Sequence, residues 1–127
     1  MSAVLLDTHA WAWSFNQPEA LPDAAAGALA RASVVYVSAV SFFEIAQKVR
    51  IGKWPEMDGR IDDLADIIRE QNCKLVPLDA DICLDAGRLI WSHRDPFDRM
   101  LAVTAKRFKA RIISADTIFD GVAPRVW

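Results

Sequence analysis

Short apolar segments rich in β-branched residues recur along the chain, each bounded by polar residues. The clearest are residues 3–6 (AVLL), 34–38 (VVYVS), 74–78 (KLVPL) and 111–114 (RIIS). Runs of this kind are typical of strands that are buried on both faces of a parallel sheet. A last segment, 124–127 (PRVW), is a weaker strand candidate because it is short and begins with proline.

Longer amphipathic segments alternate with these strands, at residues 21–32, 41–52, 61–72, 80–91 and 96–108. Within the second of them, Phe42, Ile45, Ala46 and Val49 have the spacing of a helix that buries one face. Alternating strands and helices predict an α/β/α sandwich with a central parallel sheet and right-handed crossovers. Because no repeat, low-complexity tract or linker divides the sequence, residues 1–127 are predicted to form one domain.

Composition narrows the possible partners and compartment. The 127 residues are 53% hydrophobic, enough for one core, and the net charge of −2 gives no general basic character for holding nucleic acid. Cys73 and Cys83 are too few for a disulfide framework, which fits a reducing compartment. No apolar run approaches the ~20 residues that a membrane span needs. We therefore expect a cytoplasmic protein with no membrane partner.

The segment 93–106 (HRDPFDRMLAVTAK) carries a strong signal for the start of a helix. Pro96 suits the first helical position, which makes Asp95 the N-cap and Asp98 the third helical residue. An acid at that position can bond back to the cap backbone and faces the positive end of the helix dipole. Helix capping alone can therefore explain both aspartates.

Other acids also stand where strands and helices meet. Asp7 directly follows the first strand, and Asp116 follows the fourth strand after one alanine. Glu44 completes an S-x-x-E capping box that starts at Ser41. In a doubly wound sheet, strand ends and the following helix starts lie on one edge, which is where such folds bind ligands. The capping interpretation itself therefore places these three acids and Asp98 on a single edge.

Carboxylates gathered on one edge repel one another, and a cation relieves that repulsion. These acids offer oxygen donors without His or Cys, which favours Mg²⁺ or Mn²⁺ over zinc. Such ions also bind phosphate oxygens, so phosphoester chemistry is their natural use here. Since the sequence does not fix the strand order, separate caps and a shared metal site both stay open. Glu44 also fits an ordinary surface ion pair with Lys48, one helical turn later.

Four motifs, in order and spacing, resemble the PIN-domain ribonucleases and particularly the VapC-type toxins of toxin–antitoxin pairs. They are LLDTHAWAW at the start, SFFEIAQK, HRDPFDRMLAVTAK and IISAD. The resemblance runs over nearly the whole chain and implies one PIN domain over residues 1–127. It also implies that the first strand is central in the sheet and lies next to the strand that ends in the last acid.

Carried over motif by motif, the resemblance implies that the catalytic acids are Asp7, Glu44, Asp98 and Asp116. Asp7, Asp98 and Asp116 would hold one or two Mg²⁺ or Mn²⁺ ions, and Glu44 would orient the attacking water or hold an ion through it. Asp120 is a possible substitute for Asp116. The implied reaction is hydrolysis of an RNA phosphodiester to a 5′-phosphate and a 3′-hydroxyl, and the implied partners are a cognate antitoxin and a second copy of the chain.

Other polar and aromatic residues near the motifs admit more than one role. Arg94 and Arg99 flank the acids and are predicted to contact substrate phosphates, although they would equally neutralise nearby carboxylates. His9 and His93 have no second nitrogen or thiol at ligand spacing, so we do not predict them as ligands or bases. The five tryptophans are expected to be mostly core, with exposed ones available to an antitoxin segment or a homodimer face.

Competing functions are separated by their motifs. A phosphatase of the haloacid dehalogenase type needs a second aspartate two residues after the first, but Thr8 and His9 follow Asp7. The five glycines never cluster into a phosphate-binding loop. A catalytically inactive PIN-like interaction module stays open as the alternative, although the presence of all four acids argues against it.

Overall fold

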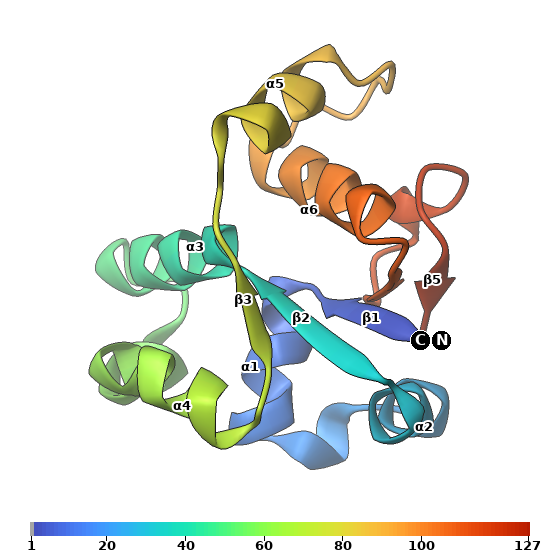
Figure 1. Ribbon diagram of the computed structural model, residues 1–127. Coiled ribbons are helices and arrows are strands. Elements are labelled where there is room, and N and C mark those ends of the chain that lie inside the picture. The colour runs from blue at the N-terminus through green and yellow to red at the C-terminus, as the bar shows by residue number, and fades with distance from the viewer. Residues whose placement is uncertain (1) are drawn as a thin grey trace.

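The computed structural model describes residues 2–127 and is built around a five-stranded sheet (Figure 1). The strands are β1 (Ala3–Leu6), β2 (Val34–Ser38), β3 (Lys74–Val76), β4 (Arg111–Ile113) and β5 (Arg125–Val126). Their order is β3-β2-β1-β4-β5, and every neighbouring pair is parallel. This confirms the predicted parallel α/β sheet. It also confirms the central position of β1 next to β4, which the resemblance implied.

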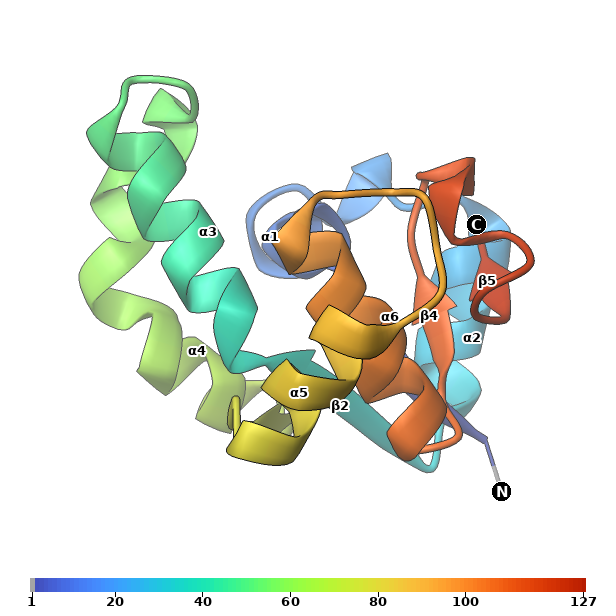
Figure 2. The ribbon, with the colours of Figure 1, turned by 90° about the horizontal axis from the view of Figure 1, so that it is seen from above.

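Helices cover both faces of the sheet. They are α1 (Thr8–Asn16), α2 (Asp23–Arg31), α3 (Ala39–Arg50), α4 (Leu64–Glu70), α5 (Ala80–Arg88) and α6 (Pro96–Arg107). Short 3₁₀ helices are η1 (Pro18–Ala20), η2 (Pro55–Asp63) and η3 (Thr117–Phe119). Figure 1 shows α5 and α6 on one side of the sheet and α1, α2 and α4 on the other. In Figure 2, α5 lies alongside α6, and α3 extends away from them together with α4.

The alternation of side chains along β1 explains why both faces need cover. Val4 and Leu6 pack into the cluster that contains Trp11 of α1 and Ile67 of α4. Leu5, between them, packs on the opposite face against Leu101 of α6. All three side chains are almost completely buried. Both faces of β1 are therefore apolar, and its sequence does not alternate between apolar and polar residues.

The helix starts test the capping predictions. α6 begins at Pro96 with Asp95 as its N-cap, whose Oδ1 accepts hydrogen bonds from the N–H groups of Phe97 (2.8 Å) and Asp98 (3.3 Å). The capping box predicted at Ser41 is wrong. α3 already begins at Ala39, because Ser38 at the end of β2 takes the N-cap and accepts a hydrogen bond from the N–H of Val40 at 3.1 Å.

Other boundaries shift by a few residues. The segment predicted as a helix from residue 61 is α-helical only over Leu64–Glu70, because its first part belongs to η2. Within residues 2–127, no helix is both long enough and apolar enough to cross a membrane.

Candidate active site

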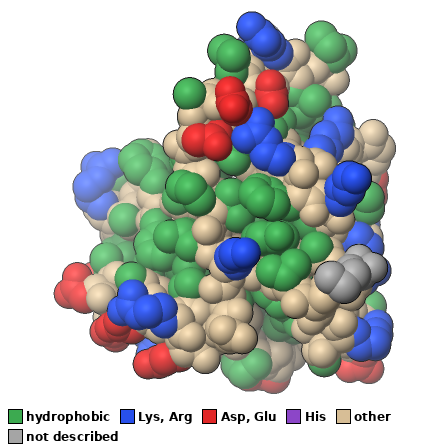
Figure 3. All heavy atoms as spheres, viewed as in Figure 1, with side chains coloured by type: hydrophobic (Ala, Val, Ile, Leu, Met, Phe, Trp, Pro, Cys, Tyr) green, Lys and Arg blue, Asp and Glu red, His purple; other side chains and the backbone are tan. Residues whose placement is uncertain are grey.

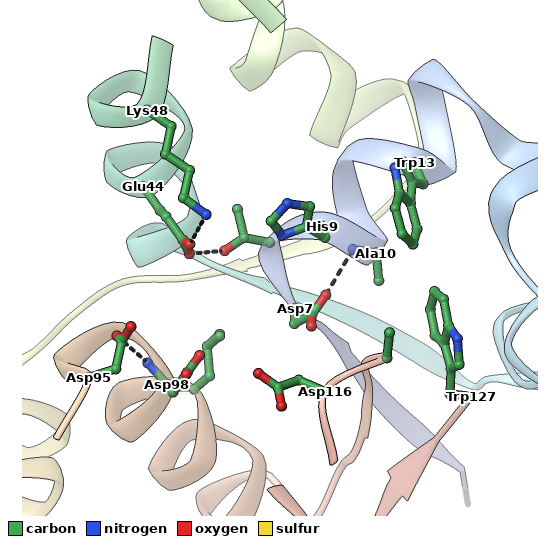
Figure 4. Close-up of a pocket in the computed structure, with 13 residues that line it drawn as sticks. Asp7, His9, Ala10, Trp13, Glu44, Lys48, Asp95, Asp98, Asp116 and Trp127 are labelled. Atoms are coloured by element: carbon green, nitrogen blue, oxygen red, sulfur yellow. Dashed lines mark hydrogen bonds and ion pairs between the residues drawn. The ribbon is translucent and has the colours of Figure 1, made fainter. Parts of the chain in front are cut away.

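The carboxyl ends of β1 and β4, the N-terminal parts of α1 and α6 and the middle of α3 surround a pocket of about 270 Å³ (Figure 4). All four acids singled out in the sequence line it: Asp7, Glu44, Asp98 and Asp116. They come from four segments that are far apart in the chain. The parallel sheet brings them together because Asp7 and Asp116 follow strands and Asp98 begins a helix at the same edge, while Glu44 reaches the pocket from the second turn of α3.

Asp7 is the most deeply placed of these acids. It is the N-cap of α1, and its Oδ1 accepts a hydrogen bond from the N–H of Ala10 at 2.8 Å. Its own N–H donates to the carbonyl of Ile113 at 3.1 Å, which joins the end of β1 to the end of β4. Burial raises the pKa of the Asp7 carboxyl, while the nearby Ser114 hydroxyl and the Ala10 N–H favour its charged form. Burial, rather than repulsion by a neighbouring acid, is therefore the main source of the shift.

Asp98 enters the pocket from the first turn of α6. Its Oδ2 accepts a hydrogen bond from Nε2–H of His93 at 2.7 Å. Burial raises the pKa of Asp98, His93 opposes that rise, and the charges of Asp95 and Asp116 add to it. Asp98 therefore does not bond back to its own cap, which leaves its carboxylate directed to the pocket and to His93.

Glu44 is held by a chain of hydroxyl groups. Its Oε1 accepts a hydrogen bond from the Thr8 hydroxyl at 2.7 Å, and the Thr8 and Ser41 oxygens are 2.9 Å apart. Because Thr8 gives its only hydroxyl hydrogen to Glu44, Ser41 donates to Thr8. Lys48 Nζ lies 2.8 Å from the other Glu44 oxygen. The Glu44 side chain is only 14% exposed, so this ion pair is not the solvated surface pair that the helical spacing allowed.

Asp116 lies at the exposed rim of the pocket. It is the N-cap of η3, where its Oδ1 accepts from the N–H of Ile118 at 3.0 Å, and its own N–H donates to the buried Ser114 hydroxyl at 3.0 Å. Asp120, the possible substitute, does not line the pocket. It forms an ion pair with Arg125 at 2.8 Å, which lowers the pKa of Asp120.

The carboxylates of Asp7, Asp98 and Asp116 face a common space in Figure 4. Their oxygen atoms suit a hard divalent ion. Among residues 2–127, however, only His93, Asp95 and Asp98 bring three possible ligand atoms within 4.8 Å of one another. A single ion held by all three predicted ligands would therefore require their side chains to rotate towards it, and would draw Asp98 partly away from His93.

Comparison with known proteins identifies the family. The family profile described as PIN domain matches residues 4–124. The chain belongs to the PIN-domain family. Among curated proteins, none matches this sequence closely enough to count as a relative.

Solved structures similar to this PIN domain include three complexes. One is a toxin–antitoxin complex from Klebsiella pneumoniae, with 16% identity, a TM-score of 0.64, and 98% of this chain and 96% of that chain covered. DNA-bound VapBC from Salmonella typhimurium has 14% identity and a TM-score of 0.65 over 98% and 96% of the two chains. VapBC2 from Rickettsia felis, bound to a promoter DNA fragment, has 14% identity and a TM-score of 0.63 over 97% and 96%. At identities this low, these similarities show that the fold is shared and nothing more.

The two arginines of the PIN domain's HRDPFDR motif differ in their surroundings. Arg99 points away from the pocket, and its guanidinium donates to four backbone carbonyls at the end of α5 and in the following loop, those of Ala86, Leu89, Trp91 and His93. This geometry gives Arg99 an architectural role in place of the predicted phosphate contact. Arg94 is exposed, and its side chain makes no hydrogen bond or ion pair within the described part of the chain.

Sequence reasoning missed several residues of this pocket. His93, which the sequence does not mark as a ligand or base, lies beside the pocket and bonds to Asp98. The signal for this contact is that His93 stands five residues before Asp98, just ahead of the predicted cap Asp95. Lys48 was assigned to the surface, yet it lines the pocket. Trp13 and Trp127 also line it, and nothing in their spacing indicated that they would meet.

Proposed function

We propose that this PIN domain is a metal-dependent endoribonuclease that acts as the toxin of a toxin–antitoxin pair, with RNA as its substrate. The observation that carries the proposal is the convergence of four carboxylates from distant segments in one pocket of a PIN domain. Burial that raises the pKa of Asp7 and Asp98 supports a cation at this position, because a positive charge offsets the cost of keeping both acids ionised. The shared fold of three toxin–antitoxin complexes supports the biological role.

In this proposal Asp7, Asp98 and Asp116 hold one or two Mg²⁺ or Mn²⁺ ions. When bound, the metal lowers the pKa of a coordinated water and offsets charge on the scissile phosphate. Glu44 accepts a hydrogen bond from the attacking water and orients it, and its own orientation is fixed by Thr8 and Lys48. Lys48 lines the same pocket and adds positive charge near the phosphate. No covalent intermediate is needed, and the products carry a 5′-phosphate and a 3′-hydroxyl.

A cognate antitoxin and a second copy of the chain are the proposed protein partners, in the cytoplasm. Figure 3 shows apolar side chains gathered over the face that carries β3. There Leu75 of β3 is 46% exposed although it belongs to the sheet. Exposed apolar side chains gathered on one face are typical of protein contacts and support a partner on this face.

Hydrolysis of single-stranded RNA tests the proposal directly. We expect cleavage with Mg²⁺ or Mn²⁺, its loss in EDTA, and a decrease of at least about 100-fold in Asp7→Asn and Asp98→Asn, since each removes a charged ligand. Asp120→Asn is the matched control, because this acid lies outside the pocket in an exposed ion pair, and it should cleave like the wild type. Cleavage that survives both EDTA and the two substitutions would disprove the metal mechanism.

The toxin assignment is tested by the growth of cells that express the wild type or one of the variants without a partner. The wild type and Asp120→Asn should arrest growth, whereas Asp98→Asn should not. Equal growth of all three strains would rule out a toxin that acts through this pocket.

One observation favours the alternative of an inactive interaction module. Lys48 pairs with Glu44 and His93 bonds to Asp98, so two of the four acids already have protein partners. If the purified wild type cleaves no RNA with either ion, this alternative replaces the nuclease. RNA cleavage that depends on Asp7 and Asp98 excludes it.

A further inference from the structure

One wall of the acid pocket is aromatic. Trp13 of α1 and Trp127 line it with their ring centroids 5.6 Å apart and their planes inclined by 39°. Figure 4 shows both indoles on one side of the pocket, with Glu44, Asp95 and Asp98 on the other. Asp7 and Asp116 lie between these two sides. The pocket therefore has an acidic half and an aromatic half.

The aromatic surface continues out of the pocket. His9 is exposed, meets Trp13 edge to face at 6.0 Å, and stacks on Trp54 at 4.5 Å with the planes inclined by 21°. His9 and Trp13 also line a neighbouring hollow, to which Lys53 and Trp54 contribute. A continuous row of rings therefore leads from the acids to a second hollow that carries a lysine.

Core packing accounts for this row only in part, because Trp54 and Trp127 pack against the hydrophobic core with only part of their surface. Trp11, in the same helix, is completely buried, and its indole N–H donates to Gln71 at 3.0 Å. Trp13 and Trp127 are only half-buried, and neither indole N–H has a protein partner within residues 2–127. Half-buried indoles with free N–H groups, beside a polar pocket, are typical of surfaces that bind a ring-shaped ligand.

Charge points to the same kind of ligand. The chain has a net charge of −2, and the pocket itself is lined by five carboxylates and a single lysine. Affinity for an RNA strand therefore cannot rest mainly on attraction of its phosphates by basic side chains. Base stacking on aromatic rings contributes affinity without basic residues, and only an unpaired, splayed base exposes its face for it.

We propose that Trp13 and Trp127 form a stacking surface for the unpaired nucleobase next to the scissile phosphate, and that His9 and Trp54 extend this surface to the adjoining nucleotide. The substrate is then single-stranded RNA, or an unpaired loop, rather than a duplex. This inference rests on the proposed ribonuclease function, because that function places the phosphate at the acids.

Binding in the Asp98→Asn background tests stacking without cleavage. The probes are a fluorescein-labelled oligoadenylate, the same strand paired with oligouridylate, and a ribose-phosphate strand of equal length without bases. Fluorescence anisotropy should show weaker binding of the single strand to Trp13→Ala by roughly 5- to 150-fold, the range of one lost base–aromatic stack. Trp13→Phe should retain most of the affinity. Phe43→Ala, which removes an aromatic side chain that is 58% exposed and does not line the pocket, should bind like its parent.

The strand without bases separates lost stacking from a damaged fold. Trp13→Ala and its parent should bind it equally, and both should bind the duplex weakly. If Trp13→Ala does not fold, Trp127→Ala replaces it. Unchanged binding of oligoadenylate, or an equal loss for the strand without bases, would overturn the inference.

Cleavage by the wild type, measured in parallel, distinguishes the two proposals. If the wild type cleaves RNA but Trp13→Ala does not weaken oligoadenylate binding, the nuclease proposal stands and the stacking surface does not. Base-dependent binding without any cleavage means that stacking stands and the nuclease does not.

Discussion

At the scale of single residues, the acids of this pocket serve the fold and the proposed chemistry at once. Asp7 and Asp116 are N-caps, and Asp98 occupies the third position of α6. Capping was predictable from sequence because it depends on neighbours within a few residues. The contacts of Asp98 with His93 and of Glu44 with Thr8 were not, because they depend on how elements pack in three dimensions.

The buried Asp7 carboxylate should destabilise the fold at neutral pH. Burial raises the pKa of Asp7 above the ordinary 3.8. Between the unfolded-state pKa and this higher folded-state pKa, the folded state therefore binds more protons than the unfolded state. The Asp7 contribution to stability is therefore lost as pH increases. Asparagine caps equally well and carries no charge, so Asp7→Asn should melt at a higher temperature than the wild type at pH 7 with a chelator present.

Thermal unfolding between acidic and neutral pH measures this effect. The advantage of Asp7→Asn should vanish below a pH of about 3.8, where both side chains are neutral. Asp120→Asn provides a control of opposite sign, because Arg125 lowers the pKa of Asp120 and its charge favours the folded state at neutral pH. If the difference in melting temperature between Asp7→Asn and the wild type does not change with pH, burial does not destabilise the charged form of Asp7.

At the scale of elements, the strands were more predictable than the helix starts. β1 and β2 match the predicted ranges, since short, continuous apolar runs between polar residues are typical of buried strands in a parallel sheet. The predicted start of α3 is wrong because it relies on the capping box at Ser41, whereas Ser38, three residues earlier, caps the helix. Because α3 follows β2 without an intervening loop, Ser38 at the end of the strand is the N-cap. Ser41 is instead completely buried and supports Thr8.

Arg99 connects α5, α6 and the loop between them, and its loss should be felt in stability. Arg99→Met keeps an apolar stem but leaves four carbonyls without their donor, which should cost about 1–3 kcal/mol of unfolding free energy in urea titrations. Arg99→Lys should recover little, because an ammonium cannot reproduce the planar arrangement of donors. Arg94→Met, at an exposed neighbour in the same motif, should leave stability unchanged. An Arg99→Met variant that is fully stable but binds RNA weakly would restore the phosphate-contact role.

At the scale of the whole molecule, strand order decides whether the acids meet. Sequence patterns give the elements but not their arrangement in the sheet, and the adjacency of β1 and β4 came only from the family resemblance. That adjacency brings the segment after residue 6 beside the segment after residue 113. The pocket is therefore built from both ends of the sequence and exists only when the sheet is complete.

A divalent ion in this pocket should for that reason stabilise the entire domain. Its proposed ligands, Asp7, Asp98 and Asp116, separate on global unfolding, so binding adds RT ln(1 + [L]/Kd) to the unfolding free energy, about 2.7 kcal/mol at about 100 times Kd. Urea titrations with Mn²⁺ should show a higher midpoint for the wild type and Asp120→Asn at an unchanged slope, and no shift for Asp98→Asn. A wild-type midpoint that stays constant at Mn²⁺ concentrations that support cleavage would mean that these three residues do not hold the ion together.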